Sequence, residues 1–272
     1  CVQTAAARVL LTGEAGAKAD AARACAAAWR RGELSAPAAG SGSKAPPRPV
    51  RPARPALKPP GQAPRRRLGS VEGRFALLHA VAHIEFNAVD LAFDLVARFG
   101  GDHRISEGER HSFITDWIGV GDDEARHFQM VRERLHQLDG EYGDLPAHDG
   151  LWEAADATSD DLAARLAVAP MVLEARGLDV TPGMITRLRG VGDEESAKLL
   201  DIIYQDEVGH VAAGRRWFEA LCRTETVEPR TRFQQLVSER FAGGLKRPFN
   251  AEARDQAGLP GDWYEPLAET PG

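Results

Sequence analysis

Beyond residue 70, apolar residues recur every three or four positions, which is the period of an amphipathic helix. Glycines and helix-capping residues divide this part of the chain, and no segment reads as a convincing strand. The pattern therefore predicts an all-α protein. The expected helices cover 71–99, 107–138, 160–177, a short stretch after Thr181-Pro182, 193–221 and 229–242. A bend is expected at Pro170 and a π-type bulge at Gly119 and Gly121. The connection 139–159 is expected to contain a short helical piece near Trp152.

The chain is expected to divide into four parts. Residues 1–35 are rich in alanine and predict an N-terminal helical hairpin with Gly13 at its bend. Residues 36–69 predict a Pro/Arg-rich extended linker. Residues 70–245 predict a four-helix bundle with an extra C-terminal helix, and residues 246–272 an irregular C-terminal tail.

The linker is strongly basic and allows two interpretations. It could contact nucleic acid, because unbalanced Lys and Arg release counterions from a phosphate backbone. It could equally be a solvated segment that wraps the bundle, and the lack of interleaved aromatic residues for base stacking favours this second interpretation. The basic residues are Lys44, Arg48, Arg51, Arg54, Lys58, Arg65, Arg66 and Arg67.

Composition narrows the class of protein. The chain has 272 residues, of which 43% are hydrophobic and 27% charged, with a net charge of −6, so it can bury a sizeable core. Only three cysteines occur, without CxxC spacing, which excludes a rubredoxin-type iron centre and favours a reducing, cytoplasmic setting. No run approaches the ~20 apolar residues that cross a bilayer, and no export signal is evident. We therefore expect a cytoplasmic protein without a membrane partner.

Four carboxylates and two histidines stand out because they interrupt the apolar stripes of four successive predicted helices. Burying four carboxylates is costly unless cations neutralise them, and two divalent metal ions would do so. The alternative is a set of surface carboxylates in ordinary salt bridges, which would have to fall on four apolar stripes. The six candidate ligands are Glu85, Glu124, His127, Glu174, Glu207 and His210.

A third Glu-x-x-His pair, Glu133 and His136, shows that this motif alone is weak evidence. Glu133 follows Glu124 by nine residues, which at about 100° per residue places it on the opposite helix face. We therefore predict that Glu133 and His136 are surface residues. His83 lies about 200° around the helix from Glu85 and is predicted to be a satisfied histidine between helices.

Further residues are expected around the metal ligands. A histidine that binds metal through one nitrogen usually donates its other N–H to a carboxylate, so we predict crossed partners, Asp206 for His127 and Asp123 for His210. Arg126 either ties these groups together or lies on the surface. Residues that either line a pocket or fill the core are Tyr204, Phe113, Trp117 and Phe128.

Four motifs carry a family resemblance: His83-Ile84-Glu85, Asp123 to Phe128, Glu174 to Asp179 and Asp206 to His210. They resemble a ferritin-like family of bacterial proteins, domain of unknown function 455, related to the tRNA-modifying monooxygenase MiaE and other di-iron carboxylate proteins. The resemblance implies a ferritin-like bundle in which the six residues bind metal, with Glu124 and Glu174 as bridges.

A carboxylate-rich site with only two imidazoles suits Fe(II) or Mn(II) better than zinc. We therefore expect two iron ions, or a Mn/Fe pair, in an oxidoreductase that activates O₂ and takes electrons from an external donor protein. A hydroxylase acting on a modified nucleoside of tRNA, or on another small organic substrate, is the first reading. A ferroxidase or peroxide scavenger, and a metal-stabilised helical protein without catalysis, remain open alternatives.

Overall fold

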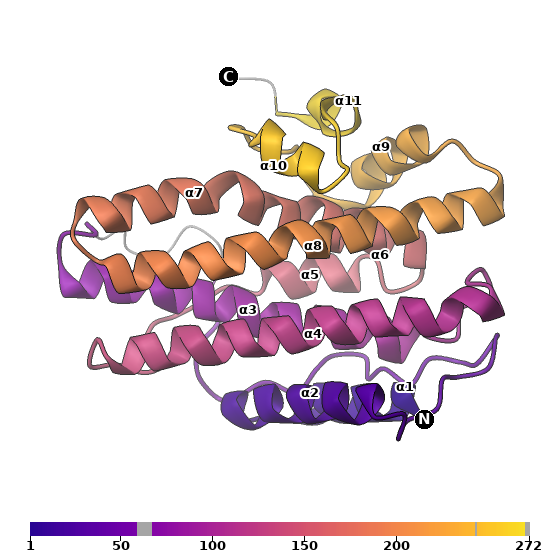
Figure 1. Cartoon of the computed structure of the whole chain (residues 1–272), viewed down its shortest axis with the longest axis horizontal. Coiled ribbons are helices and arrows are strands. Elements are labelled where there is room, and N and C mark those ends of the chain that lie inside the picture. Colours follow the sequence, from indigo (N-terminus) through magenta and orange to yellow (C-terminus); the bar gives the residue numbers. More distant parts are fainter. Residues whose placement is uncertain (59–66, 243, 270–272) are drawn as a thin grey trace. The chain divides into compact units, whose positions relative to one another are not determined.

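The computed structural model describes residues 1–58, 67–242 and 244–269, and over these residues the protein is all-α, as predicted (Figure 1). The described residues contain two isolated β-bridges and no strand. The helices are α1 Val2–Leu11, α2 Ala15–Arg30, α3 Val71–Phe99, α4 Glu107–His136, α5 Gly150–Asp156, α6 Leu162–Val168, the π-helix η1 Ala169–Glu174, α7 Ala175–Gly190, α8 Glu194–Glu225, α9 Pro229–Arg240, α10 Ala251–Gln256, α11 Gly261–Tyr264 and the 3₁₀ turn η2 Glu265–Leu267.

The chain forms two compact units. The first unit comprises residues 1–152 and 187–199, and the second comprises residues 153–186 and 200–272. None of the helices in the described ranges has the length and apolar character needed to span a membrane.

In the first unit, α3 and α4 pack against each other and carry α1 and α2 on their outer faces. Both long helices begin where the sequence predicts, because the Ser70 hydroxyl accepts the Gly73 N–H and the Ser106 hydroxyl accepts the Glu109 N–H. The predicted π-bulge at Gly119 and Gly121 is wrong, since α4 is α-helical throughout.

The linker lies along the first unit and is held there by buried charge. Lys18 of α2 donates to Asp90 of α3 at 2.6 Å and to the Val50 carbonyl at 2.9 Å, and Arg51 lies 3.2 Å from Asp90. Two more linker arginines form ion pairs in the same unit, Arg48 with Asp149 and Arg54 with Asp144. The wrapping interpretation therefore agrees with the structure for these three arginines, whereas Arg65 and Arg66 lie outside the described residues.

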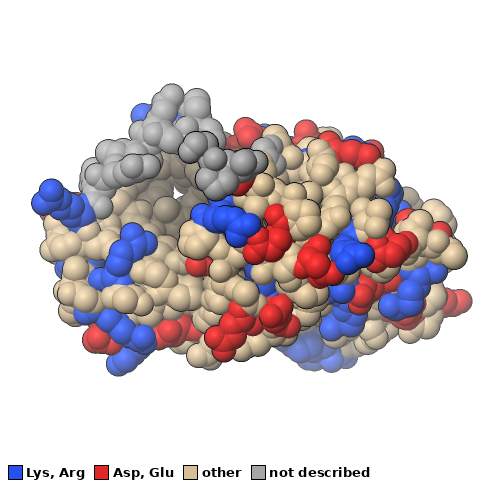
Figure 2. Space-filling model, turned by 90° about the horizontal axis from the view of Figure 1, so that it is seen from above, with Lys and Arg blue, Asp and Glu red and all other residues tan. Residues whose placement is uncertain are grey.

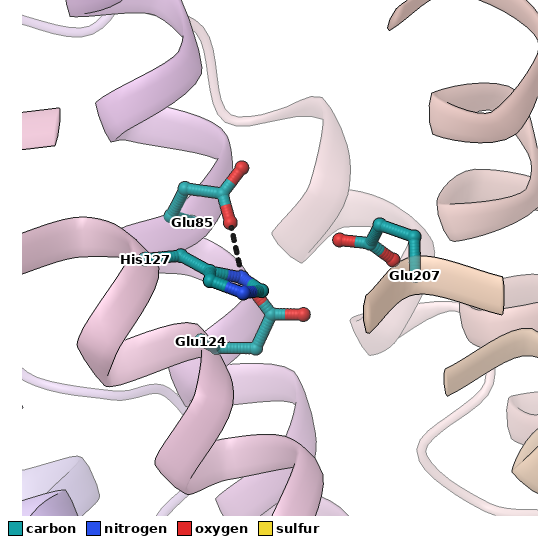
Figure 3. Close-up of side chains that lie close together, drawn as sticks. All are labelled: Glu85, Glu124, His127 and Glu207. Carbon is teal, nitrogen blue, oxygen red and sulfur yellow. Dashed lines mark ion pairs between the residues drawn. The ribbon is translucent and has the colours of Figure 1, made fainter. Parts of the chain in front are cut away.

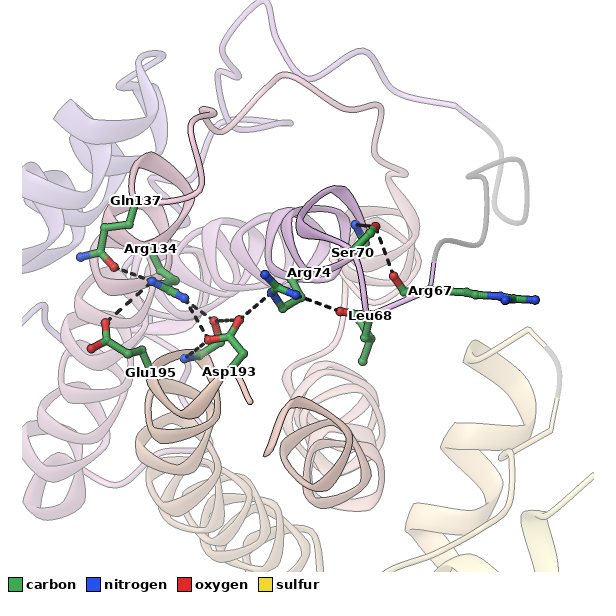
Figure 4. A network of polar contacts seen from close by, with 10 residues as sticks. Arg67, Leu68, Ser70, Arg74, Arg134, Gln137, Asp193 and Glu195 are labelled. Carbon is green, nitrogen blue, oxygen red and sulfur yellow. Dashed lines mark hydrogen bonds and ion pairs between the residues drawn. The ribbon is translucent and has the colours of Figure 1, made fainter. Parts of the chain in front are cut away.

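The start of α8 is fixed to α3 and α4 by one carboxylate (Figure 4). Asp193 accepts the Ser196 N–H and hydroxyl, receives a 2.9 Å hydrogen bond from Arg134, and lies 3.2 Å from Arg74. Burial alone would raise the pKa of Asp193, but the bonds from Ser196 and Arg134 outweigh it and lower the pKa. Helix α8 then continues unbroken from this clamp to Glu225.

In the second unit, the helix predicted over 160–177 is divided by a π-helix that ends at Glu174, so the bend expected at Pro170 takes this form. Helix α7 runs straight through Pro182, where a helix break was expected. The carbonyl that Pro182 leaves without its helical donor belongs to Leu178, and Asn250 Nδ2 donates to it at 3.1 Å.

The segment expected as an irregular tail contains α10 and α11. Arg254, only 2% exposed, forms a 2.7 Å ion pair with Asp179 of α7 and stacks on Tyr264. The C-terminal segment is therefore built into the second unit by a buried, paired charge.

Candidate metal centre

The first unit brings together three of the predicted ligands (Figure 3). Glu85 comes from α3, and Glu124 and His127 come from α4, so polar side chains from both helices interrupt the apolar contact between them. His127 Nδ1 lies 3.3 Å from Glu85 Oε2 and 3.5 Å from Glu124 Oε2, and the three side chains are 0–4% exposed. We call this group cluster 1; its ligand atoms lie within 4.8 Å of one another.

Cluster 1 has a strong field of negative charge. Burial lowers the pKa of His127, but hydrogen bonds and charge from Glu124 and Glu85 outweigh this and raise it to about 11. Two buried carboxylates thus attract one positive group into the core. A divalent cation in place of the proton on His127 would neutralise both carboxylates, and it would bind the imidazole in its neutral form.

The second unit brings together the other three predicted ligands, Glu174, Glu207 and His210, whose ligand atoms also lie within 4.8 Å of one another. His210 Nδ1 is 3.5 Å from Glu207 Oε2, one turn away on α8. Glu174 is the last residue of the π-helix and is half-buried. We call this group cluster 2.

Two predictions about neighbouring histidines are confirmed. Glu133 and His136 are exposed on α4, so the third Glu-x-x-His pair lies on the surface. His83 Nε2 lies 2.9 Å from the His148 carbonyl, which requires that this nitrogen donate, and Nδ1 therefore accepts the Tyr142 hydroxyl at 2.9 Å. His83 is satisfied on both nitrogens and is not available to bind metal.

The comparisons with known proteins assign a family. The model of the family described as "Protein of unknown function (DUF455)" matches residues 11–265. The chain belongs to the DUF455 family. It is similar to a Haemophilus influenzae protein described as "Uncharacterized protein", with 40% identity over 217 residues that cover 79% of this chain and 75% of the relative. No solved structure matches. Neither description names an activity, so only the two clusters bear on the function of this protein.

In this DUF455 protein the groups predicted to support the ligands have partners of their own. Arg126 donates to Asp123 at 3.1 Å on α4, and Asp206 is half-buried on α8. The crossed pairing of Asp206 with His127 and of Asp123 with His210 stays a prediction.

The residues predicted to line a pocket lie mainly in packed surroundings. Phe113, Trp117 and Phe128 are 0–1% exposed, and Phe128 packs edge-on to Tyr142 at 5.1 Å. The Tyr204 hydroxyl accepts a 3.1 Å hydrogen bond from Asn250 Nδ2. Their role beside a substrate stays a prediction.

The sequence interpretation did not foresee the contacts of three residues. Tyr142 covers His83 from the loop after α4, and the Tyr in that loop gave no periodic signal. Pro170 and Gly214 were visible as a helix breaker and a small residue, but their contact in the second unit could not be foreseen. An ideal Cβ on Gly214 would lie 2.5 Å from the Pro170 ring.

The donor sets of both clusters fit hard or borderline divalent cations. Each cluster offers two carboxylates and one imidazole. The three cysteines, all within the described residues, belong to neither cluster. Carboxylate and imidazole donors in this ratio suit iron or manganese, whereas structural zinc sites usually contain more nitrogen or sulfur. Each cluster is therefore a candidate site for one metal ion.

Proposed function

We propose that this protein is a di-iron carboxylate oxidoreductase that activates O₂ and hydroxylates an organic substrate. The observation that carries the proposal is the repeated donor set: two clusters, each with two glutamates and one histidine, each containing a Glu-x-x-His pair on a long helix. In the proposal each cluster holds one iron ion, and the order of the six ligands along the chain is that of di-iron four-helix bundles.

Charge balance supports two metal ions. Four carboxylates carry four negative charges, and two divalent cations neutralise them while leaving both histidines neutral as ligands. Without such cations, Glu124 at 0% exposure and Glu85 at 3% exposure share one histidine as their positive partner, and burying the remaining negative charge is costly. In each cluster one divalent cation would balance two carboxylates, whereas one protonated histidine balances only one.

The chain's own residues hold the metals and control their surroundings. In the proposal, Glu85, Glu124 and His127 would hold one ion, and Glu174, Glu207 and His210 would hold the other. When bound, two reduced iron ions would supply electrons to O₂ and an oxidant for a C–H bond; Mn/Fe is the alternative pair.

The proposed substrate class is a modified nucleoside of tRNA, suggested by the family resemblance. On the described part of the face drawn in Figure 2, basic and acidic side chains are interspersed. Because Arg48, Arg51 and Arg54 already pair with carboxylates, these three arginines add little unbalanced charge for phosphate binding. We therefore propose recognition of the nucleoside itself, with an external protein as electron donor.

The test begins with metal content. Protein purified in air is analysed by elemental mass spectrometry beside the Glu124→Ala and Glu207→Ala variants, with anaerobic Fe(II) addition as a second condition. We expect about two irons per chain in the wild type and a loss in both variants. A wild type that binds no metal under either condition would overturn the proposal.

Oxygen consumption then separates the two metal-dependent functions. A hydroxylase consumes O₂ in proportion to added nucleoside when a chemical reductant is present. A ferroxidase or peroxide scavenger consumes O₂ or peroxide with Fe(II) alone and is indifferent to the nucleoside. Two bound irons with no turnover in either assay would leave a metal-stabilised helical protein.

A further inference from the structure

Two features explain the π-helix that ends at Glu174 of cluster 2. Pro170 causes it, and the contact of Pro170 with α8, which we call the lock, holds it in place. Pro170, at its second position, has no N–H to continue the α-helical pattern. The Ala175 N–H instead bonds to the Pro170 carbonyl five residues back, which is the wider π-type ring. One extra residue is thereby accommodated just before Glu174.

The lock is the contact between Pro170 and α8. Gly214 presents no side chain there, and a Cβ at this position would lie 2.5 Å from both Pro170 Cβ and Cγ and 3.5 Å from Met171 Cγ. Real Cβ atoms do not approach other atoms so closely, so the ring of Pro170 can seat against α8 only because residue 214 is glycine.

This contact fixes which residues face each other across the hairpin. Helices α7 and α8 are joined by a short turn and run antiparallel, so a step forward from Pro170 corresponds to a step back from Gly214. Glu174, four residues after Pro170, then lies opposite His210, four residues before Gly214. On α8, Gly214 and Glu207 are seven residues apart and share a face. The ligand atoms of cluster 2 do lie within 4.8 Å.

We infer that Pro170 and Gly214 are positioning residues that set Glu174 against Glu207 and His210 by locking the π-helix onto α8. The inference rests on the proposed function for its metal readout. It assigns the two residues no contact with metal or substrate. According to this inference, the position of Glu174 along and around its helix depends on Gly214, which lies seven residues after Glu207.

A matched pair of substitutions in one helix tests the lock. Gly214→Ala inserts a methyl group against Pro170, whereas Gly209→Ala adds the same methyl group to α8 at an exposed position with nothing within 4 Å. Both changes favour helix equally. Only the first forces the π-helix away from α8, so any difference between the variants reports the contact.

The first readout needs no metal. Hydrogen–deuterium exchange of metal-free protein is followed by mass spectrometry in peptides spanning 168–176. We expect Gly209→Ala to exchange in these peptides at the wild-type rate. In Gly214→Ala we expect exchange to be at least tenfold faster. Equal exchange in the two variants would overturn the lock whether or not the protein binds metal.

The second readout is metal binding, with Co(II) as the probe, followed by its visible absorption and by equilibrium dialysis. We expect the wild type and Gly209→Ala to bind two ions, and Gly214→Ala to bind one as tightly as the wild type and the other at least tenfold more weakly. Full binding of both ions by Gly214→Ala would overturn the positioning role. A wild type that binds none defeats the proposed function, and the exchange result alone then decides the lock.

Pro170→Ala provides a second variant in case Gly214→Ala does not fold. Restoring the N–H at residue 170 allows the α-helical bond to the Leu166 carbonyl and removes the cause of the π-helix. We expect unchanged helix content by circular dichroism together with weakened binding of the same single ion. Unchanged binding in a folded Pro170→Ala protein would count against the inference.

Discussion

Clusters 1 and 2 have the same residue types but different supports. Cluster 1 lies between two uninterrupted α-helices, and its side chains are 0–4% exposed. In cluster 2 the Glu207 side chain is 11% exposed, and half-buried Glu174 ends a π-helix. The same donor set is thus built once on a regular, buried support and once on an irregular, slightly more exposed one. Cluster 1 is the more deeply buried of the two groups.

Both clusters nevertheless use the same device to bring helices close. In the first unit, a Cβ on Gly121 would lie 2.5 Å from the Phe93 ring; in the second, a Cβ on Gly214 would meet Pro170 at the same distance. Each glycine lies within two turns of a ligand on its own helix. Close helix approach at a glycine is therefore common to both clusters, and the π-helix is the feature that separates them.

The largest effect is expected from removing one charge in cluster 1. Glu124→Gln keeps the shape of the side chain but loses a carboxylate, and we expect metal affinity to fall by more than about 100-fold, because changes even in groups that only support metal ligands cost about 10–100-fold. Glu133→Gln is the matched control, since it changes the exposed copy of the motif on the same helix. Isothermal titration with Co(II) measures both. Equal losses in the two variants would contradict the assignment of Glu124.

The support of cluster 1 is expected to fail in acid. His79 of α3 accepts the Gly143 N–H at 2.9 Å, and burial lowers the pKa of His79 to about 4. The unfolded chain binds this proton near pH 6.5, so the stability from neutral His79 is full above that pH and is lost as the pH falls towards 4. The loss is at most about 3 kcal/mol.

Urea unfolding of metal-free protein between pH 7 and pH 4 measures this dependence. His79→Gln keeps an acceptor for Gly143 but does not titrate in this range, so its stability should fall less steeply than that of the wild type. Because His83 also has a pKa lowered by burial to about 4, some acid sensitivity must remain. Identical slopes for variant and wild type would show that His79 is not the group concerned.

The regular support of cluster 1 was predictable from sequence, because local signals set it. Ser70 and Ser106 cap their helices, and the paired glycines after Phe99 end α3 at the predicted residue. The apolar stripes then indicated which faces are buried, and Glu85, Glu124 and His127 lie on them. Periodicity also separated Glu133 and His136 from the buried pair.

The irregular support of cluster 2 was predictable only in part: a bend at Pro170 was expected, but its π-helical form and the contacts distant in sequence were not. Glycines in α4 suggested a π-bulge, but a glycine removes no hydrogen bond, whereas Pro170 does. Pro182 suggested a helix break, but Asn250 supplies a donor to the Leu178 carbonyl from 72 residues away. No pattern within one helix reveals such a donor.

A smaller effect is expected from closing the glycine approach in cluster 1. Gly121→Ala places a methyl group against the buried Phe93 ring, and overpacking of this kind costs about 1–3 kcal/mol. Gly119→Ala, two residues earlier with nothing within 4 Å, should stabilise α4 by up to about 1 kcal/mol. Urea unfolding of both variants measures the difference. If Gly121→Ala is as stable as Gly119→Ala, α3 and α4 do not depend on a close approach at Gly121.

The smallest effect concerns a buried tryptophan on the ligand face of α4. Trp117 is 1% exposed and lies seven residues before Glu124, and its indole N–H finds no hydrogen-bond acceptor in the described chain. Trp29, 6% exposed, donates its indole N–H to Thr115 at 3.0 Å. Replacing either by Phe loses similar apolar contact, but only the change at Trp29 loses a hydrogen bond. Trp117→Phe should therefore cost about 1 kcal/mol less than Trp29→Phe in urea unfolding. A larger cost at Trp117 would mean that its N–H has an acceptor in solution, such as an ordered water, and would contradict the contrast between a dry cluster 1 and a more exposed cluster 2.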